Sequence, residues 1–453
     1  MQKIKKYKWY ILLPIVIIIL TVTVCVVVEN ILKQENVEEH IELGKRYLMD
    51  LNYSGAVLEF KNAIVIDPNN EEARIQLAEA YYQSNDLDMS AQVLKDVINE
   101  ESPNIRMSEE LIQVYLKSDN NVGALTVIQD LIEYTDDEKY YEMKEEIVGE
   151  VQQASHSYAK GTDHELMIIN HKLMSRGRNV LGQLGTSLGL GDKTYQQENF
   201  RDAGFSQTPH KVFTAGRTGY VVDTEGKLWA AGENRWGQKG ISYGSLLPES
   251  GWVKVEDGDH VSKVAGTTGN VYVLKENGSL WHAGGTKSQK LEPVKEFSVV
   301  LDVYEHNSMI YVHTAKGEVY VKDMRNASAW NLLKKNVRIY SITENEQCVW
   351  IDIEGNIGLP RQLTNVPENW TLNADGTYRA DVNIVDMICV NNQYFFLTSK
   401  KELLQLSPEG MIHSMEMEAE VENIYREADK VIAELTDGKL LNWDSNLLAW
   451  KTM

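Results

Sequence analysis

The stretch AGRTGYVVDTEGKLWAAGENRWGQKG, Ala215 to Gly240, holds two short apolar runs on either side of a turn. The first run ends at Asp223, the pair Glu225-Gly226 follows, and the second run ends in three closely spaced glycines. Because glycine adopts positive φ without strain, an acidic residue followed by glycine between two apolar runs predicts a tight β-hairpin.

The plan of strand, turn and strand recurs from about Ser155 to the C-terminus, and we count seven such hairpins. Their spacing is that of four-stranded propeller blades. The turn glycines follow a polar residue in Glu225-Gly226, Asn277-Gly278, Lys316-Gly317, Glu354-Gly355 and Asp437-Gly438. Large rings stand three residues after three of these glycines, as Trp229, Trp281 and Tyr320. We expect those rings to pack between neighbouring blades.

A glycine-rich motif follows the first two hairpins. One copy comprises Gly177, Asn179, Gly182, Gln183, Leu184 and Gly185. An altered copy comprises Gly232, Asn234, Gly237, Gln238, Lys239 and Gly240. The motif resembles the repeat of the regulator of chromosome condensation family, and that resemblance implies a seven-bladed all-β propeller over residues 155–453. Members of the family act as nucleotide exchange factors, enzyme inhibitors and interaction platforms, so the resemblance implies a fold more than an activity.

A second repeat, with a step of 34 residues, runs from about Val37 to Asp136. Its columns include Leu43, Leu77 and Leu111, then Tyr47, Tyr81 and Tyr115, then Phe60, Leu94 and Ile128. Alternating small and large residues at helical spacing predict pairs of closely packed helices. The stretch HIELGKRYLMDLNYSGAVLEFKNAIVIDPNN resembles the tetratricopeptide repeat through Leu43, Gly44, Tyr47, Ala56, Phe60, Ala63 and Pro68. The resemblance implies an all-α superhelix over residues 37–153, ending in a capping helix near Glu138 to Gln153.

Repeats of this family bind peptides or partner helices on the face formed by the first helix of each pair. Mapping that geometry onto this chain gives eight candidate partner-binding residues: Lys45, Met49, Glu79, Tyr82, Gln83, Arg106, Gln113 and Lys117. The family's clamp for a C-terminal carboxylate uses basic and asparagine residues at set places. This chain has Ile41, Lys45 and Gln76 there, which argues against that clamp.

The N-terminus, MQKIKKYKWYILLPIVIIILTVTVCVVVEN, has four lysines before an uncharged run from Trp9 to Val28. About twenty residues at about 1.5 Å each cross a hydrocarbon core, whereas a cleaved signal has a shorter apolar region. We expect residues 1–8 to be a basic cytoplasmic tail, residues 9–28 a single transmembrane helix, and the bulk of the chain to be extracytoplasmic. A buried soluble helix, or a lipoprotein modified at Cys25, is the alternative; Val24 is bulkier than lipoprotein cleavage tolerates.

Catalytic and metal-binding signatures are weak in the sequence. There is no His-Glu-x-x-His and no calcium loop, and GTSLGLGD at Gly185 to Asp192 lacks the Lys-Ser/Thr end of a phosphate-binding loop. The same stretch contains a Gly-x-Ser-x-Gly match at Gly185 to Gly189, which we interpret as part of a connection between propeller strands. The three cysteines, Cys25, Cys348 and Cys389, are too scattered for a disulfide framework. The sequence therefore predicts a protein without enzymatic activity, cofactor or metal.

The net charge of −21 becomes −25 when the four lysines of residues 1–28 are set aside. Such a chain repels nucleic acid, and we expect a protein or peptide partner that is basic, steered by acids such as Glu79 and Glu109. The sequence favours a membrane-anchored interaction scaffold. One alternative is an enzyme acting on cell-wall or glycan substrates through the propeller. The other is a regulator like a guanine nucleotide exchange factor, whose GTPase partner the expected topology keeps out of reach.

Overall fold

The computed structural model describes residues 33–96, 98, 103–151, 155–241, 249–285, 288–326, 328–407, 410–428, 430–444 and 449–453. Packing divides the chain into two compact units, between Ser118 and Asp119. The expected anchor, Trp9 to Val28, lies outside the described residues. Within the described ranges, no helix has both the length and the apolar character needed to cross a membrane.

The first unit is a series of packed helices. It comprises a helix over residues 33–49, then α2 (Tyr53–Ile66), α3 (Glu71–Gln83), α4 (Leu87–Lys95) and α5 (Ile105–Lys117). Each numbered helix packs on the next one along the chain. The starts of these four are capped by side chains that accept a hydrogen bond from a backbone N–H three residues on, namely Asn52, Asn70, Asp86 and Asn104. Asn and Asp are strongly preferred at this position.

The repeat columns form the core of this unit. Phe60 is fully buried, and a Cβ added to Gly44 would lie 2.5 Å from its ring, so the large residue fits only against the small one. The small residue Ser90 is also fully buried, and its hydroxyl donates to Ala78 O at 2.8 Å. These contacts confirm that the small and large columns mark where paired helices approach closely.

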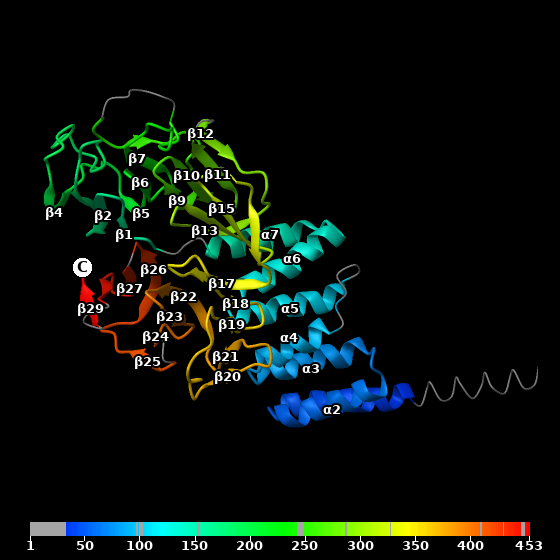
Figure 1. Ribbon diagram of the computed structural model, residues 1–453. Coiled ribbons are helices and arrows are strands. Elements are labelled where there is room, and N and C mark those ends of the chain that lie inside the picture. Colours follow the sequence, from blue (N-terminus) through cyan, green and yellow to red (C-terminus); the bar gives the residue numbers. More distant parts are fainter. Residues whose placement is uncertain are drawn as a thin grey trace, which may run out of the picture. The chain divides into compact units, whose positions relative to one another are not determined.

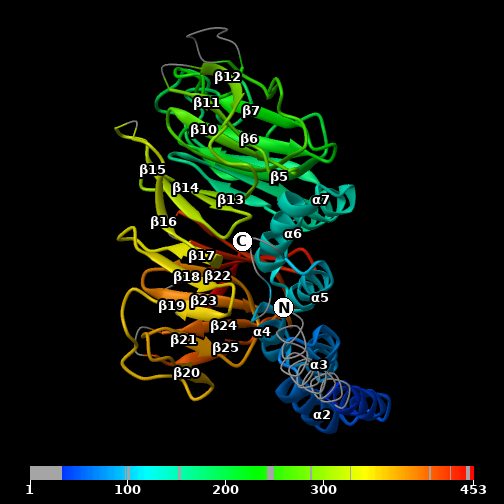
Figure 2. The same cartoon turned by 90° about the vertical axis from the view of Figure 1, so that its right-hand side faces the viewer.

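The second unit contains seven antiparallel sheets among its described residues, which we call blades one to seven (Figures 1 and 2). Blade one comprises β1 (Tyr158–Lys160), β2 (His164–Ile169), β3 (Lys172–Gly177) and β4 (Gln197–Asp202). Blade two comprises β5 (Pro209–Ala215), β6 (Thr218–Asp223), β7 (Leu228–Gly232) and β8 (Val253–Lys254). Blade three comprises β9 (Val261–Thr267), β10 (Asn270–Lys275), β11 (Leu280–Gly284) and β12 (Ser288–Pro293).

Blade four comprises β13 (Val300–His306), β14 (Met309–Thr314), β15 (Val319–Asp323) and β16 (Asn331–Lys334). Blade five has five strands: β17 (Val337–Ile342), β18 (Cys348–Asp352), β19 (Asn356–Gly358), β20 (Trp370–Leu372) and β21 (Tyr378–Ala380). Blade six comprises β22 (Ile384–Val390), β23 (Gln393–Thr398), β24 (Leu403–Leu406) and β25 (Ile412–Met415). Blade seven comprises β26 (Val421–Glu427), β27 (Lys430–Leu435), β28 (Leu440–Asp444) and β29 (Ala449–Thr452).

The first strand of each blade lies toward the centre of the ring in Figure 1, and most neighbouring pairs of these strands are in contact. Blade one meets blade seven through side chains, without a shared strand. Tyr158 and Met167 of blade one pack on Tyr425 and Ile432 of blade seven. The seven-bladed propeller that the hairpin spacing predicts is therefore confirmed.

The opening stretch forms β6, its turn and β7, as predicted. Asp223 Oδ1 accepts hydrogen bonds from the backbone N–H groups of Glu225 at 2.9 Å and Lys227 at 3.0 Å, while Gly226 has a φ of 73°. Asp223 Oδ2 accepts from Trp229 Nε1 at 2.8 Å. One carboxylate thus fixes both the turn and the ring, and Trp229 packs against the core between blades one and two.

The glycine-rich motif builds the loop that follows a blade's third strand. Asn179 Oδ1 accepts from Leu184 N at 2.8 Å, and Asn234 Oδ1 accepts from Lys239 N at 2.9 Å in the second copy. Gln238 Nε2 reaches Thr268 O of blade three at 2.9 Å. Because Asn and Gln here satisfy backbone groups, the motif is structural.

The second unit also includes α6 (Asn121–Thr135) and α7 (Glu138–Val151), which the sequence repeats assign to the helical array. Asn120 Nδ2 donates to Ile353 O in the turn after β18 at 2.7 Å, and Glu133 lies 3.5 Å from Lys316 in the turn before β15. The helices thus lie over turns of the propeller. Whether residues 37–153 and 155–453 fold independently stays a prediction.

Candidate partner-binding face

The eight candidate residues lie on the first helix of each predicted pair. Lys45 and Met49 belong to the helix over residues 33–49; Glu79, Tyr82 and Gln83 to α3; and Arg106, Gln113 and Lys117 to α5. We call these residues, with Glu72 and Glu110, the partner-binding face. Met49 is 79% exposed and Gln113 is exposed, and neither takes part in the contacts described next.

Glu72 joins the two cations of the face. Its Oε1 lies 3.3 Å from Lys45 Nζ, and its Oε2 lies 3.0 Å from Arg106 Nη1, so one carboxylate links all three first helices. Partial burial raises the pKa of Glu72, but hydrogen bonds and attraction from Lys45 and Arg106 outweigh it and lower the pKa below its usual value. The charges of Lys45 and Arg106 are therefore offset within the unit.

The third cation, Lys117, is held by Tyr82. Its Nζ lies 3.8 Å from the centre of the Tyr82 ring, within the range of a cation–π contact, and donates to Tyr82 O at 3.0 Å. Gln83 Nε2 donates to Glu79 Oε1 at 2.5 Å. These contacts connect α3 to α5 and fix the side chains at one end of the face.

Glu110 marks the acidic part of the face. Burial and then repulsion from Glu79 raise its pKa above the usual value; Arg106 opposes this rise, and Glu109 adds to it. Carboxylates that repel one another in a half-buried place favour a cation between them. The acids, rather than the paired cations, carry the unbalanced charge of the face.

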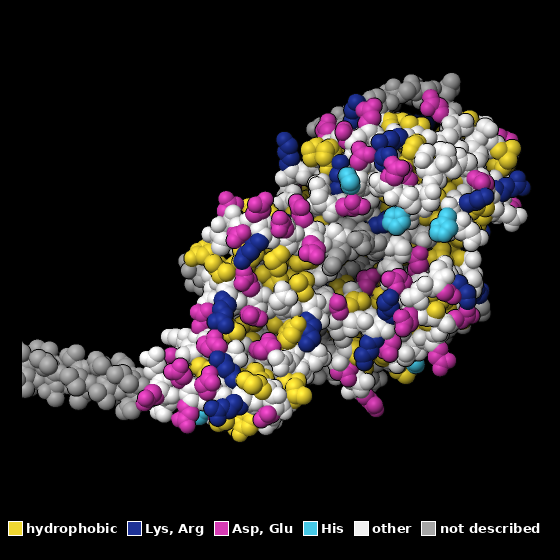
Figure 3. Space-filling view, turned by 180° about the vertical axis from the view of Figure 1, so that it is seen from behind, with side chains coloured by type: hydrophobic (Ala, Val, Ile, Leu, Met, Phe, Trp, Pro, Cys, Tyr) yellow, Lys and Arg dark blue, Asp and Glu magenta, His cyan; other side chains and the backbone are white. Residues whose placement is uncertain are grey.

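Sequence reasoning missed Glu72 and Glu110, although the repeat contained the signal. At the 34-residue step, the column Glu38/Glu72/Arg106 contains the candidate Arg106, and the column Glu42/Gln76/Glu110 lies three residues before the column of Lys45. A search for charged residues at those positions would have found both. Figure 3 shows acidic side chains scattered over its view with basic ones between them, so surface charge alone does not locate a site.

The two cysteine thiols among the described residues lie outside this face and are poorly reactive. Burial raises the pKa of Cys348 and of Cys389 to about 12, which keeps both thiols protonated and poorly nucleophilic at neutral pH. Across the described residues, no group of three or more His, Cys, Asp or Glu side chains could hold a metal ion.

A family model described as tetratricopeptide repeat matches residues 48–107. No curated protein sequence matches the chain. Among solved structures, Prp20p from Saccharomyces cerevisiae is 14% identical, covers 65% of this chain and 83% of its own, and has a TM-score of 0.46. Human WBSCR16 is 14% identical, covers 60% of this chain and 70% of its own, and has a TM-score of 0.37. BamB from Moraxella catarrhalis is 10% identical, covers 64% of this chain and 82% of its own, and has a TM-score of 0.36.

Proposed function

We propose that the chain is a non-catalytic interaction scaffold whose helical unit binds a basic segment of a partner protein. Tetratricopeptide and propeller folds are typical of protein-interaction scaffolds. The observation that carries the proposal is the acid pair Glu79 and Glu110, where burial and then repulsion from Glu79 raise the pKa of Glu110. Lys45 and Arg106 are paired with Glu72, and Arg106 offsets only part of the rise in the pKa of Glu110.

A library of random peptides, selected on the full chain, tests this proposal. We expect the selected peptides to be rich in Lys or Arg. The double variant Glu79→Gln with Glu110→Gln should weaken their binding about tenfold, because each lost charge pair is worth about 0.5 to 1 kcal/mol. Glu39→Gln, an exposed acid on the helix over residues 33–49, is the matched control and should bind as the wild type does.

Salt dependence gives a second reading of the same experiment. Association should slow as salt rises from roughly 0.05 to 0.5 M, since the screening length shortens to a few ångströms over that range. Selection of neutral or acidic peptides, or an association rate that does not change with salt, would contradict the proposal of a basic partner.

We further propose that the chain is anchored in the cell membrane by residues 9–28, with residues 1–8 in the cytoplasm and the bulk outside it. Four lysines before an unbroken apolar run support this orientation. Protease added to intact cells should digest the propeller. Protection until lysis would contradict the orientation, and replacing Lys3, Lys5, Lys6 and Lys8 by Glu should weaken or invert it.

A further inference from the structure

A pocket of about 170 Å³ lies between blades three and four and is open on one side. It is lined by Tyr272 of β10, His282 of β11, Glu292 and Pro293 of β12, Val294 and Glu296 after β12, Lys322 of β15, and Trp330 before β16. None of these residues belongs to the partner-binding face. The pocket therefore needs an explanation of its own.

Aromatic rings form a corner in this pocket. The rings of Tyr272 and Trp330 lie 5.8 Å apart at an interplanar angle of 76°, so the two walls are close to perpendicular. The ring of His282 lies 4.6 Å from that of Tyr272. Phe297 packs on the other side of the corner, 5.1 Å from Trp330, and supports it from the core.

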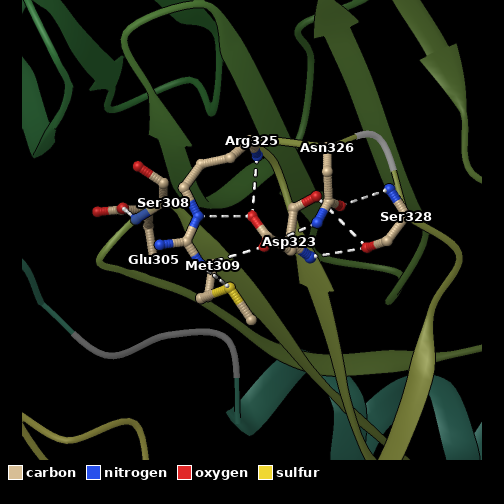
Figure 4. Close-up of polar contacts among 7 residues, drawn as sticks. All are labelled: Glu305, Ser308, Met309, Asp323, Arg325, Asn326 and Ser328. Carbon is tan, nitrogen blue, oxygen red and sulfur yellow. Dashed lines mark hydrogen bonds and ion pairs between the residues drawn. The ribbon is translucent and has the colours of Figure 1, made fainter.

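The turn after β15 lies in the chain between two of the lining residues, Lys322 and Trp330. Asp323, next to Lys322, accepts hydrogen bonds from Arg325 N at 2.9 Å and from Asn326 Nδ2 at 3.1 Å (Figure 4). Its backbone N–H donates to Ser328 Oγ at 3.1 Å. Asp323 thus connects Arg325, Asn326 and Ser328 beside the pocket.

The charges around the corner are predominantly negative. Glu292 and Glu296 are exposed carboxylates, and Lys322 is the single basic side chain among the lining residues. Burial and the nearby Lys322 lower the pKa of His282 to about 4, against a smaller opposing effect of Glu292. The imidazole is therefore uncharged at neutral pH, which leaves two acids facing one base.

We propose that this pocket receives a cationic side chain, Lys or Arg, of a partner protein. Aromatic faces within about 6 Å attract a cation, and carboxylates at the rim neutralise it. Lys322 Nζ, 5.3 Å from the centre of the Trp330 ring, shows that this corner already accommodates a cation of the chain itself. The site adds a contact on the propeller that the proposed function of the helical unit does not require.

Fluorine NMR of the full chain, labelled with 5-fluorotryptophan and kept in neutral detergent, tests the pocket. The Trp330 resonance is assigned from Trp330→Phe. We expect the peptide acetyl-Gly-Lys-Gly-amide to shift that resonance with a Kd on the order of 1 mM. The matched peptide with norleucine in place of lysine has the same length without the charge, and it should not shift the resonance.

Variants separate charge from shape. Glu292→Gln with Glu296→Gln should weaken binding of the lysine peptide about threefold or more, and Lys322→Met should tighten it, because it removes a competing cation. Glu368→Gln, an exposed acid of blade five, is the control and should change nothing. No shift with the lysine peptide, an equal shift with norleucine, or affinity unaffected by the double variant would overturn the proposal. So would preferential binding of acetyl-Gly-Asp-Gly-amide that depends on Lys322.

Discussion

At the scale of single residues, Glu110 contributes unfavourably to the stability of the helical unit. Its folded pKa is raised, so the folded state binds the proton more tightly than the unfolded state does. The associated stability is fully present below the unfolded pKa and is lost as pH rises through the folded pKa. Neutral pH is therefore the condition under which the ionised carboxylate costs stability.

We predict that Glu110→Gln raises the Tm of the helical unit at pH 7 by roughly 1 °C, and that the gain disappears below the ordinary pKa of glutamate. Thermal unfolding followed by helical circular dichroism across pH measures this. Glu109→Gln, at the neighbouring position, is the comparison variant. A Tm that falls at pH 7, or a gain that persists in acid, would show that the carboxylate is not repelled in the folded state.

The pKa shift of Glu72, and with it the pH dependence of its contribution to stability, has the opposite sign. Its folded pKa is lowered, so its contribution is present above the unfolded pKa and is lost as pH falls through the folded pKa. We predict that Glu72→Gln destabilises the helical unit at pH 7 by less than about 1 kcal/mol, because all three partners are partly exposed. Chemical denaturation at pH 7 and in acid checks this, and the difference from wild type should shrink in acid.

Arg426 is the residue on which the centre of the propeller depends most clearly. Its side chain is 5% exposed, and its Nη1 donates to Ile342 O of blade five at 2.8 Å and to Cys389 O of blade six at 3.1 Å. Its Nη2 lies 3.3 Å from Glu344. One side chain of blade seven thus ties three blades together.

We predict that Arg426→Met lowers the unfolding free energy of the propeller by about 2 to 3 kcal/mol, since two buried carbonyls lose a charged donor. Denaturant unfolding followed by tryptophan fluorescence measures the loss. Arg361→Met removes an exposed arginine of blade five and should leave the transition in place. Equal effects of the two changes would refute the role given to Arg426.

At the scale of elements, Asn120, the residue before α6, makes two hydrogen bonds with its side chain. Asn120 Oδ1 caps the helix by accepting from Gly123 N at 3.0 Å, while Nδ2 donates to Ile353 O of the propeller. We predict that Asn120→Ala costs about 1 to 2 kcal/mol and increases hydrogen exchange over α6 and the turn near Ile353 together. Asn70→Ala removes a cap in the helical unit and should affect α3 alone.

Local elements could be predicted from sequence because their causes are local. Asp223, Gly226 and Trp229 lie within one hairpin, so their spacing in the sequence predicts the turn. The contact of Asn120 with Ile353 joins positions 233 residues apart and has no periodic signature. For that reason the repeats assign α6 to the array, and the packing of its other face could not be foreseen. Glu72 was missed although the candidate Arg106 stands in the same 34-residue column.

At the scale of the whole molecule, α6 and α7 make the extent of the second unit testable. A fragment over residues 119–453 retains the two helices, and one over residues 155–453 lacks them. We predict a higher Tm and a more cooperative transition for the longer fragment, because α6 buries residues such as Val122 and Leu125. Calorimetry compares them. Equal Tm values would mean that the helices add nothing to the propeller, as the predicted boundary near Ala154 implies.

The ring's closure by side chains bears on how the protein is made. Blades one to six consist of consecutive strands, so each can form as the chain emerges. The surface of Tyr158 and Met167, however, meets its partners Tyr425 and Ile432 only after the last blade has been synthesised. Until then blade one presents an apolar edge to its surroundings. The ring can therefore close only after the final blade has been synthesised. A chain that ends within that blade exposes the apolar surface of blade one and is a natural target for quality control.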